Sequence, residues 1–394
     1  MSFDPALLRA SFAVVECRAD QLVRFFYVHL FAHHPDLRRH FPADLTEQRD
    51  RLFRALAHVV RQLDQPARLT EYLRALGRDH RRYRAAAEHY AAVGASLVAA
   101  VRHFSGRTWT QETERSWTEA YAVVSRTMLE AAEEEDGAPA WWEAEVTHRR
   151  RAAPDLVVLT LRPDRPYRHT AGQYLTLGSP RLPQLWRPYS IANAPRPDGT
   201  LELHVRRVPG GRLSPVLVHD VLPGERLLLG APQGTAVLDP ASRRPVLAVA
   251  GGTGWGAVKA LLEQLARGPA RPVTVYLAAR DDADQYDLAA VTALVAEHPW
   301  LEVVLAAPEY GTDPAEAAAL LRTGLRRHGD WSGHDVYLSG PPALAPELTR
   351  LLTGLHADPA LIRHDPVPPP PRPGGHLSPA EWLLGPPPDP LPGR

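Results

Sequence analysis

The chain has 394 residues, 44% of them hydrophobic, which is enough for two or three domains with proper cores. Its 45 basic and 45 acidic residues cancel without long runs of one sign, which argues against nucleic-acid and anionic-membrane partners. Cys17 is the only cysteine and therefore excludes an intrachain disulfide, a thiolate zinc site and a cysteine-ligated iron–sulfur cluster.

No targeting or membrane segment is expected. Residues 1–10 lack a basic stretch followed by an apolar core, and nowhere do about 18 uninterrupted apolar residues occur. The expected location is therefore the cytoplasm.

The first predicted domain, residues 1–137, is all-helical. Helix-breaking prolines and glycines are sparse up to residue 132. Apolar residues recur at helical spacing in four stretches: Leu22–Leu30, Leu52–Leu63, Val93–Val101 and Val123–Met128. Helices that cannot bury all their faces in pairs need a multi-helix pack, and such packs often enclose a cofactor.

His80 lies on the inward stripe of its expected helix, after Leu73 and Leu76 and before Tyr83. Most histidines at such spacing are ordinary core or surface residues. Neutral imidazole is also the usual iron ligand in a helical haem pocket, so spacing alone leaves both interpretations open.

Short motifs in the helical block follow one another in a fixed order: Phe26-Tyr27, His34-Pro35-Asp36-Leu37, Phe41-Pro42, Gln48-Arg49, Leu52-Phe53, His80, Glu88-His89-Tyr90 and Val93-Gly94. In this order, and almost without gaps from about Leu22 to Met128, the block resembles the globin domain of the flavohaemoglobins.

The resemblance implies a haem b site. It makes His80 the proximal iron ligand, and Tyr27 and Gln48 the distal polar pair over the iron. Phe41 would pack on the porphyrin and Leu52 would form a distal apolar wall. Without the resemblance, Tyr27 is an ordinary core tyrosine and Gln48 a surface glutamine.

The proximal side departs from the family pattern. Asp79 stands where family members often have a lysine, which reverses the charge near the haem edge. The family's tyrosine that polarises the proximal imidazole corresponds to Tyr90, but its glutamate partner falls on Ala132. Whether neighbouring Glu130 or Glu133 supplies the carboxylate stays open.

The second predicted domain, residues 138–240, is a small antiparallel β-barrel. Short β-type runs alternate with Pro-Gly, Gly-Gly and Asp-Gly turns. The runs are Trp142–His148, Leu156–Arg162, Gln173–Leu177, Leu201–Arg207 and Arg226–Leu229.

Within the barrel stands the tetrapeptide Arg187-Pro188-Tyr189-Ser190. Alone it is weak, since an ordinary turn and strand edge would account for it. Gly172-Gln173-Tyr174 precedes it, and Gly210-Gly211-Arg212-Leu213-Ser214 follows it as a glycine turn that opens a helix and offers N–H groups to phosphate. Together the three pieces resemble the FAD domain of the ferredoxin reductase-like group.

That resemblance implies specific FAD contacts. Arg187 would meet the pyrophosphate, Tyr189 would lie against the isoalloxazine ring, and Ser190 would reach toward the reactive flavin nitrogen. The remaining implied contacts are Tyr174, Pro188, Gly211 and Ser214.

The third predicted domain, residues 241–365, is an α/β domain with a parallel sheet. Strand runs alternate with helical segments at Val246–Ala250, Val273–Ala279, Leu301–Ala306 and Val336–Ser339.

The first of these strands ends in Gly251-Gly252-Thr253-Gly254, where a dinucleotide backbone can approach a helix N-terminus closely. A tight turn is the plainer interpretation of this cluster. With Ser339-Gly340-Pro341 after a later strand, it resembles the nicotinamide dinucleotide domain of the same reductase group, which implies that the domain binds NADH or NADPH. Arg280 is expected either to meet the adenosine ribose or its 2′-phosphate, or to be an ordinary exposed arginine.

The C-terminal end combines a family-like acid with an unusual tail. Asp365 keeps the acid that precedes the family's flavin-covering aromatic residue, but Val367 stands where that ring is expected. Residues 366–394 are proline-rich, and the prediction is a polyproline-like or disordered tail in which residues 378–384 dock on the protein or a partner.

The resemblance implies that electrons pass from NAD(P)H through FAD to haem iron, because a flavin can accept two electrons and release one at a time. It further implies that nitric oxide and dioxygen are converted to nitrate. One alternative is a peroxide or dioxygen reductase that uses the same path. The other is a haem gas-sensor module that controls a flavin reductase.

Overall fold

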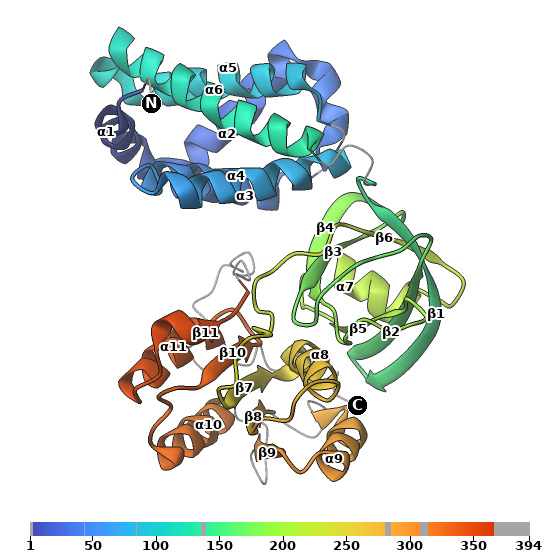
Figure 1. Cartoon of the computed structure of the whole chain (residues 1–394). Coiled ribbons are helices and arrows are strands. Elements are labelled where there is room, and N and C mark those ends of the chain that lie inside the picture. Colours follow the sequence, from blue (N-terminus) through green and yellow to red (C-terminus); the bar gives the residue numbers. More distant parts are fainter. Residues whose placement is uncertain are drawn as a thin grey trace, which may run out of the picture. The chain divides into compact units, whose positions relative to one another are not determined.

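The computed structural model describes residues 3–42, 44–83, 85–134, 139–279, 285–307 and 314–365. The chain divides into two compact units: a helical unit up to Trp141 and a sheet unit from Trp142 (Figure 1). The predicted order of helical block, antiparallel sheet and parallel sheet is confirmed. The domain boundaries at 137, 240 and 365 stay predictions. The predictions that concern Arg280, Val367 and the C-terminal tail lie outside the described residues.

The helical unit is built from six α-helices and three short 3-10 turns among the described residues. They are α1 (Pro5–Glu16), α2 (Ala19–His33), η1 (Pro35–His40), α3 (Thr46–Arg61), α4 (Pro66–His80), η2 (Arg81–Tyr83), α5 (Ala87–Ser105), η3 (Gly106–Thr108) and α6 (Gln111–Glu133). Local chemistry sets several ends. Asp4 caps α1 by accepting from two backbone N–H groups, Thr110 caps α6, and Pro66 occupies the first turn of α4.

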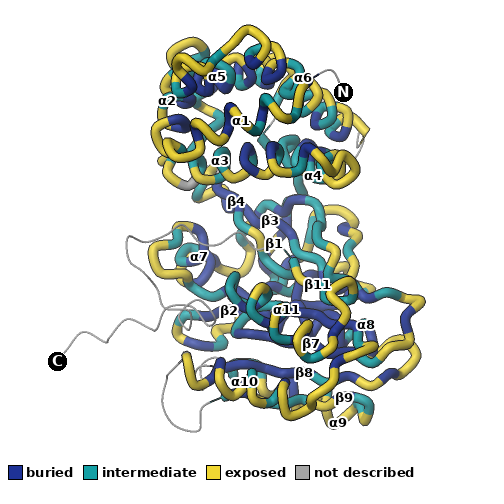
Figure 2. The backbone as a smooth tube through the Cα atoms, turned by 90° about the vertical axis from the view of Figure 1, so that its left-hand side faces the viewer, coloured by how far each residue is buried: buried dark blue, intermediate teal, exposed yellow. Residues whose placement is uncertain are grey.

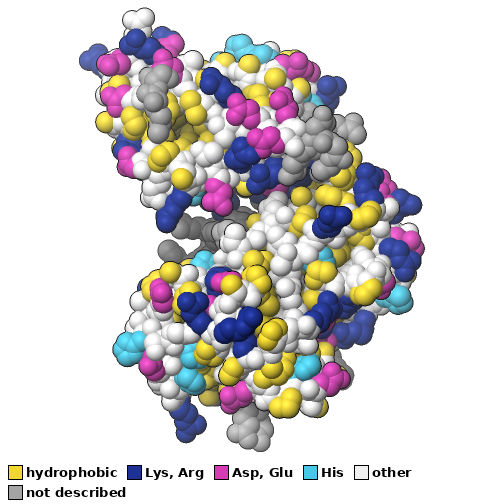
Figure 3. All heavy atoms as spheres, viewed as in Figure 1, with side chains coloured by type: hydrophobic (Ala, Val, Ile, Leu, Met, Phe, Trp, Pro, Cys, Tyr) yellow, Lys and Arg dark blue, Asp and Glu magenta, His cyan; other side chains and the backbone are white. Residues whose placement is uncertain are grey.

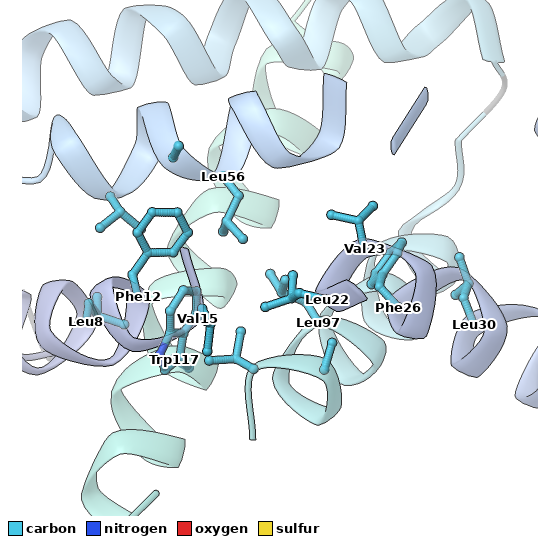
Figure 4. Close-up of a cluster of buried hydrophobic side chains, with 14 of the residues drawn as sticks. Leu8, Phe12, Val15, Leu22, Val23, Phe26, Leu30, Leu56, Leu97 and Trp117 are labelled. Atoms are coloured by element: carbon cyan, nitrogen blue, oxygen red, sulfur yellow. The ribbon is translucent and has the colours of Figure 1, made fainter. Parts of the chain in front are cut away.

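The apolar interior of the helical unit has two separate clusters. The larger joins α1, α2, α3, α5 and α6, and includes Phe12, Phe26, Leu56, Leu97 and Trp117 (Figure 4). A smaller one is centred on Leu73, Tyr90 and Met128. The buried residues of the helical unit thus form two clusters, and the partly buried Leu69 packs against both.

Helices α4 and α6 approach closely at Gly77. A Cβ atom there would lie within 2.2 Å of the Met128 carbonyl oxygen. Glycine therefore sets the spacing between these helices, and α4 carries His80 at its end.

The sheet unit begins with an antiparallel sheet of six described strands in the order β4-β3-β6-β1-β2-β5. The strands are β1 (Trp142–Ala153), β2 (Leu156–Pro163), β3 (Tyr174–Ser179), β4 (Leu182–Ser190), β5 (Leu201–Arg206) and β6 (Arg226–Leu229). A short α-helix α7 (Leu213–Pro215) and a π-helical turn η4 (Val216–Asp220) follow β5. The strand order leaves β4 and β5 as the edge strands, and the sheet curves into a half-barrel (Figure 1).

The second sheet is parallel, in the order β11-β10-β7-β8-β9. Its elements are β7 (Val246–Gly251), η5 (Gly252–Gly254), α8 (Trp255–Leu265), β8 (Val273–Ala278), α9 (Leu288–Glu297), β9 (Leu301–Ala306), α10 (Pro314–His328), β10 (Asp335–Ser339), α11 (Leu344–Gly354), η7 (Pro359–Leu361) and β11 (Ile362–Arg363). Helices α8 and α9 pack on one face, and α10 and α11 on the other. The central strands are consequently buried on both sides (Figure 2).

On the face shown in Figure 3, neither basic nor acidic side chains predominate over the helical unit, where the two kinds are interspersed. Within the described part of the chain, none of the helices combines the length and apolarity that spanning a bilayer requires.

Candidate functional site

His80 ends α4 with its ring oriented by its own helix. The Nδ1 atom lies 2.7 Å from the Leu76 carbonyl oxygen. A carbonyl oxygen can only accept, so Nδ1 carries the proton and Nε2 keeps its lone pair. Burial lowers the pKa of His80, which keeps the imidazole neutral. A neutral ring fixed through its other nitrogen is the form of histidine that ligates metals.

Tyr27 and Gln48, predicted as a pair from positions 21 residues apart, are brought together. Tyr27 on α2 is 3% exposed, and burial raises the pKa of its phenol well above the usual range. The Gln48 side chain hydrogen-bonds to Tyr27, and with the charge of Arg49 it lowers the pKa only partly. The phenol therefore stays protonated and able to donate.

Aromatic rings pack around the Tyr27 phenol. The Tyr27 ring centroid lies 5.6 Å from that of Phe41 in an edge-on arrangement, and the Phe31 and Phe41 centroids are 5.4 Å apart. Phe41 and Leu52 both pack against the larger cluster yet stay only partly buried. Their placement agrees with the predicted apolar walls, whose contact with haem stays a prediction.

The residues of the helical unit fit a haem. Tyr27 belongs to the larger cluster, whereas the His80 ring lies 6.3 Å from that of Tyr90 in the smaller one. Large apolar side chains of both clusters are only half-buried although helices surround them, Leu52 in one and Leu76 in the other. A flat apolar group carrying iron would cover such side chains and meet a neutral imidazole nitrogen.

The proximal carboxylate, for which the sequence left Glu130 and Glu133 as candidates, stays a prediction. Tyr90 is 8% exposed, and burial raises its pKa to about 12. Glu130 and Glu133 are both exposed, and Ala132 carries no carboxylate. The only hydrogen bond recorded for the His80 ring in the described structure is the one to a backbone carbonyl.

The flavin tetrapeptide lies at the end of β4, directly beside β3. In the antiparallel register Ser190 stands opposite Tyr174, and Tyr189 opposite Leu175. Two motifs that the sequence predicted separately therefore share one strand pair. Burial raises the pKa of Tyr189, so this phenol is neutral, and Arg187 is half-buried and donates to the Trp186 carbonyl at 3.0 Å. Pro188 faces Thr176 in the same pair.

Asp365, which was not among the predicted site residues, joins this strand pair. A Cβ at Gly234 would lie 2.6 Å from Asp365 Oδ1 and 3.0 Å from the Tyr174 ring. Asp365 Oδ1 is buried and has no hydrogen-bond partner among the described residues. Burial raises the pKa of the carboxyl to about 6, and backbone hydrogen bonds from Thr235 and Ala236 lower it only partly. An unsatisfied carboxyl oxygen beside Tyr174 suits a polar flavin atom, so the residues fit this group. The sequence signal for Asp365 was its position as the family-like acid near the C-terminal end.

The Gly210–Ser214 turn is held by its own side chain. Ser214 Oγ accepts from the Val208 N–H at 2.9 Å, and a Cβ at Gly211 would lie 2.9 Å from the Val208 carbonyl oxygen. Ser214 thus stabilises the turn that the sequence predicted, while phosphate contact by Gly211 and Ser214 stays a prediction.

The two dinucleotide motifs meet at the carboxyl ends of neighbouring strands β7 and β10. A Cβ at Gly254 would lie 2.3 Å from the Ser339 carbonyl oxygen, and one at Gly251 would lie 3.1 Å from Pro341 Cδ. Gly340 and Gly252 have positive φ values of 158° and 53°. Thr253 lies within the same turn, and the backbone there is bare enough for a pyrophosphate to approach.

Comparisons with known proteins agree with this order of sites. Residues 24–128 match the globin family model, and residues 143–237 match the model of the oxidoreductase FAD-binding domain. A flavohemoprotein of Bordetella pertussis is 27% identical over 364 residues, which are 85% of this chain and 90% of that protein. Reductase component 1 of the terephthalate 1,2-dioxygenase of a Comamonas species is 34% identical over 227 residues, 55% of this chain and 67% of that protein.

A solved structure shows the same whole-chain architecture. The flavohemoglobin of Malassezia yamatoensis, determined with bound FAD and heme, superposes with a TM-score of 0.74 at 17% identity, covering 92% of this chain and 97% of that one. A globin match followed by a reductase match, in a chain similar to flavohemoproteins over most of its length, identifies the combination. The chain belongs to the flavohaemoglobin family.

Proposed function

We propose that the protein is an NAD(P)H-dependent nitric oxide dioxygenase of the cytoplasm, with haem b, FAD and NADH or NADPH as cofactors. Two molecules each of nitric oxide and dioxygen would take up the two electrons of one NAD(P)H and yield two nitrates, NAD(P)⁺ and one proton. The observation that carries the proposal is the neutral imidazole of His80 in the same helical unit as a buried, protonated Tyr27 phenol.

The helical unit supplies the gas-handling residues in this proposal. When bound, haem supplies a one-electron iron centre that takes a gas ligand. His80 Nε2 would hold the iron. Tyr27 keeps its proton because burial raises its pKa, so the hydroxyl donates toward negative charge that develops on the distal side. Gln48 orients that hydroxyl, and Phe41 with Leu52 excludes water.

The proximal side favours dioxygenation over peroxide cleavage. Strong electron donation from an anionic proximal ligand favours O–O bond cleavage. His80 donates to a backbone carbonyl. Glu130 and Glu133, the candidates for the proximal carboxylate, are both exposed. The imidazole therefore gains little negative character, which weakens the alternative of a peroxide reductase.

The sheet unit supplies the hydride path. When bound, FAD accepts an electron pair and releases single electrons. Arg187 and Ser190 on β4, with Tyr174 opposite, would hold the flavin, and Tyr189 would cover its ring. Gly251–Gly254 and Ser339–Pro341 would hold the dinucleotide. Arg280 as a ribose or 2′-phosphate contact also belongs to this proposal.

Rapid mixing of the oxygenated protein with nitric oxide tests the proposal. Nitrate should form stoichiometrically and far faster than the oxygenated protein autoxidises. Nitrate formation slower than autoxidation would retire the dioxygenase function while leaving the reductase path in place.

A further inference from the structure

Lys259 is the only lysine in the chain, so arginine supplies the other 44 of its 45 basic residues (45 − 1). It lies in α8 and is only 8% exposed. A buried lysine in a chain that otherwise uses arginine indicates a place for a compact ammonium rather than a planar guanidinium.

The Lys259 ammonium meets one acceptor for each of its three N–H donors. Nζ lies 2.8 Å from Glu263 Oε1, 3.1 Å from Glu202 Oε1 and 3.2 Å from the Ala192 carbonyl oxygen. All its hydrogen-bonding capacity is thus used inside the protein. Glu263 belongs to α8, whereas Ala192 and Glu202 belong to the antiparallel part of the sheet unit.

The acceptors of Lys259 are themselves held in place. Burial alone would raise the pKa of Glu202, but hydrogen bonds and charge from His204 and Lys259 hold it well below its usual range. His204 Nε2 lies 3.0 Å from Glu202 Oε1, and His204 Nδ1 lies 2.7 Å from the Tyr286 hydroxyl. Glu263 Oε2 also accepts from the Ala194 N–H at 3.0 Å.

This network connects the segments that carry the two predicted cofactor sites. Ala192 follows the last residue of the flavin strand, Ser190, by two positions. Helix α8 begins directly after the Gly251–Gly254 turn. The start of α8 packs tightly against the segments that hold Ala192 and His204. A Cβ at Gly256 would lie 2.9 Å from Ala192 Cβ and 3.2 Å from His204 Nδ1.

We propose that Lys259 is a positioning residue for hydride transfer, holding the start of α8 and its dinucleotide turn at the working distance from the flavin strand. In this step the C4–H bond of the nicotinamide breaks and the hydride forms an N–H bond at the flavin, so the nicotinamide is oxidised and the flavin reduced. Hydride transfer needs its two reacting atoms about 3–3.5 Å apart, so small shifts of α8 matter. The inference rests on the proposed function.

The test is Lys259→Met in the full chain loaded with FAD and haem. Anaerobic stopped-flow mixing with NADH or NADPH should show flavin bleaching about 100-fold slower than in the wild type, as expected for a displacement near 1 Å. The deuterium isotope effect with 4-deuterated nucleotide should rise. Electron transfer from photoreduced flavin to haem should keep its wild-type rate, because α8 takes no part in it.

Arg271→Met is the matched control. Arg271 is 7% exposed and pairs with the fully buried Asp335 at 3.0 Å. Asp335 begins β10 and Arg271 precedes β8, at the strand ends away from the dinucleotide turn. Breaking this pair costs stability without moving α8 relative to β4, so flavin bleaching in Arg271→Met should stay near the wild-type rate.

Gly256→Ala is a second variant that changes no charge. Its methyl group should push α8 away from Ala192 and His204 and slow flavin bleaching by the same geometric route. A wild-type bleaching rate in Lys259→Met or Gly256→Ala, or equal slowing in Arg271→Met, would overturn the role of Lys259. If neither nucleotide bleached the flavin of the wild type, the proposed function itself would be wrong. A wild-type protein that bleaches normally, with variants that bleach equally fast, would contradict only the role of Lys259.

Discussion

Tyr27 shows how one residue can be assigned a chemical state from its surroundings. Its phenol is almost fully buried, and burial raises its pKa, so the hydroxyl keeps its proton throughout the neutral range. Gln48 hydrogen-bonds to it from α3, a different helix. The sequence could name both residues only through a family resemblance, because neither position is unusual for a core tyrosine or a helical glutamine.

Tyr27→Phe should accelerate the dissociation of dioxygen about 10- to 100-fold, since a hydrogen bond to a charged partner is worth about 1.5–3 kcal/mol. Flash photolysis or stopped-flow ligand replacement measures that rate. Tyr72→Phe, which changes a tyrosine packed against the smaller cluster, is the control and should leave the rate unaltered. Equal rates in wild type and Tyr27→Phe would remove Tyr27 from the distal site.

Asp365 should make folding stability depend on pH. Burial raises its pKa to about 6, above the value near 3.9 of an unfolded aspartate. Its favourable contribution is therefore complete below about pH 4 and is lost as the pH rises through about 6. Asp365→Asn should be more stable than the wild type at pH 8 by on the order of 2 kcal/mol, discounted for partial exposure, and equal to it near pH 4.

Urea denaturation of the full chain at both pH values measures this difference. Asp220→Asn, at an exposed aspartate, is the control and should show no such dependence. A constant difference between pH 4 and pH 8 would show that Asp365 is not buried in the folded protein.

At the scale of elements, the close approach of α4 and α6 positions the end of α4. Gly77 lies against the backbone of Met128, and His80 follows it by three residues. The sequence showed only a glycine within a helical pattern, which is ordinarily a mild weakness. Only the structure shows that Gly77 allows α4 to pack closely against Met128 of α6.

Gly77→Ala should therefore destabilise the helical unit by about 1–3 kcal/mol, the usual cost of overpacking, and lower haem affinity by displacing His80. Urea denaturation and transfer of haem to apomyoglobin measure the two effects. Gly354→Ala, where the added Cβ would meet no described residue outside its own helix turn within 4 Å, should change neither. Unchanged haem affinity in a destabilised Gly77→Ala would separate helix spacing from the haem site.

The elements themselves were largely predictable. The β-runs and the strands of the parallel sheet agree with the structure to within a few residues, apart from β1, which continues to Ala153. Arg149–Arg151 lie in that extension. Because charged residues on the exposed face of a strand interrupt the apolar pattern, the sequence did not predict that β1 continues there. Of the predicted apolar stretch Val123–Met128, Met128 is buried whereas Val123 is 37% exposed.

At the scale of the whole molecule, the proposed path predicts how two absorption bands respond together. Anaerobic NADH or NADPH should bleach the flavin and shift the Soret band of the wild type. His80→Ala should lose the haem signal yet bleach its flavin normally, because the sheet unit holds the hydride path by itself. A Soret band that stays unchanged while the wild-type flavin bleaches fully would contradict the electron path.

The sequence by itself determined the order of helical block, antiparallel strands and parallel strands and the place of each motif, because periodicity and turn chemistry are local properties of the chain. Only the tertiary structure decided which motifs meet: Tyr174 opposite Ser190, Gly254 against Ser339, and Asp365 beside Gly234. These contacts depend on strand register and on packing between segments far apart in the chain. For the same reason the sequence marks Lys259 only as the single lysine, and its three acceptors are brought together by folding.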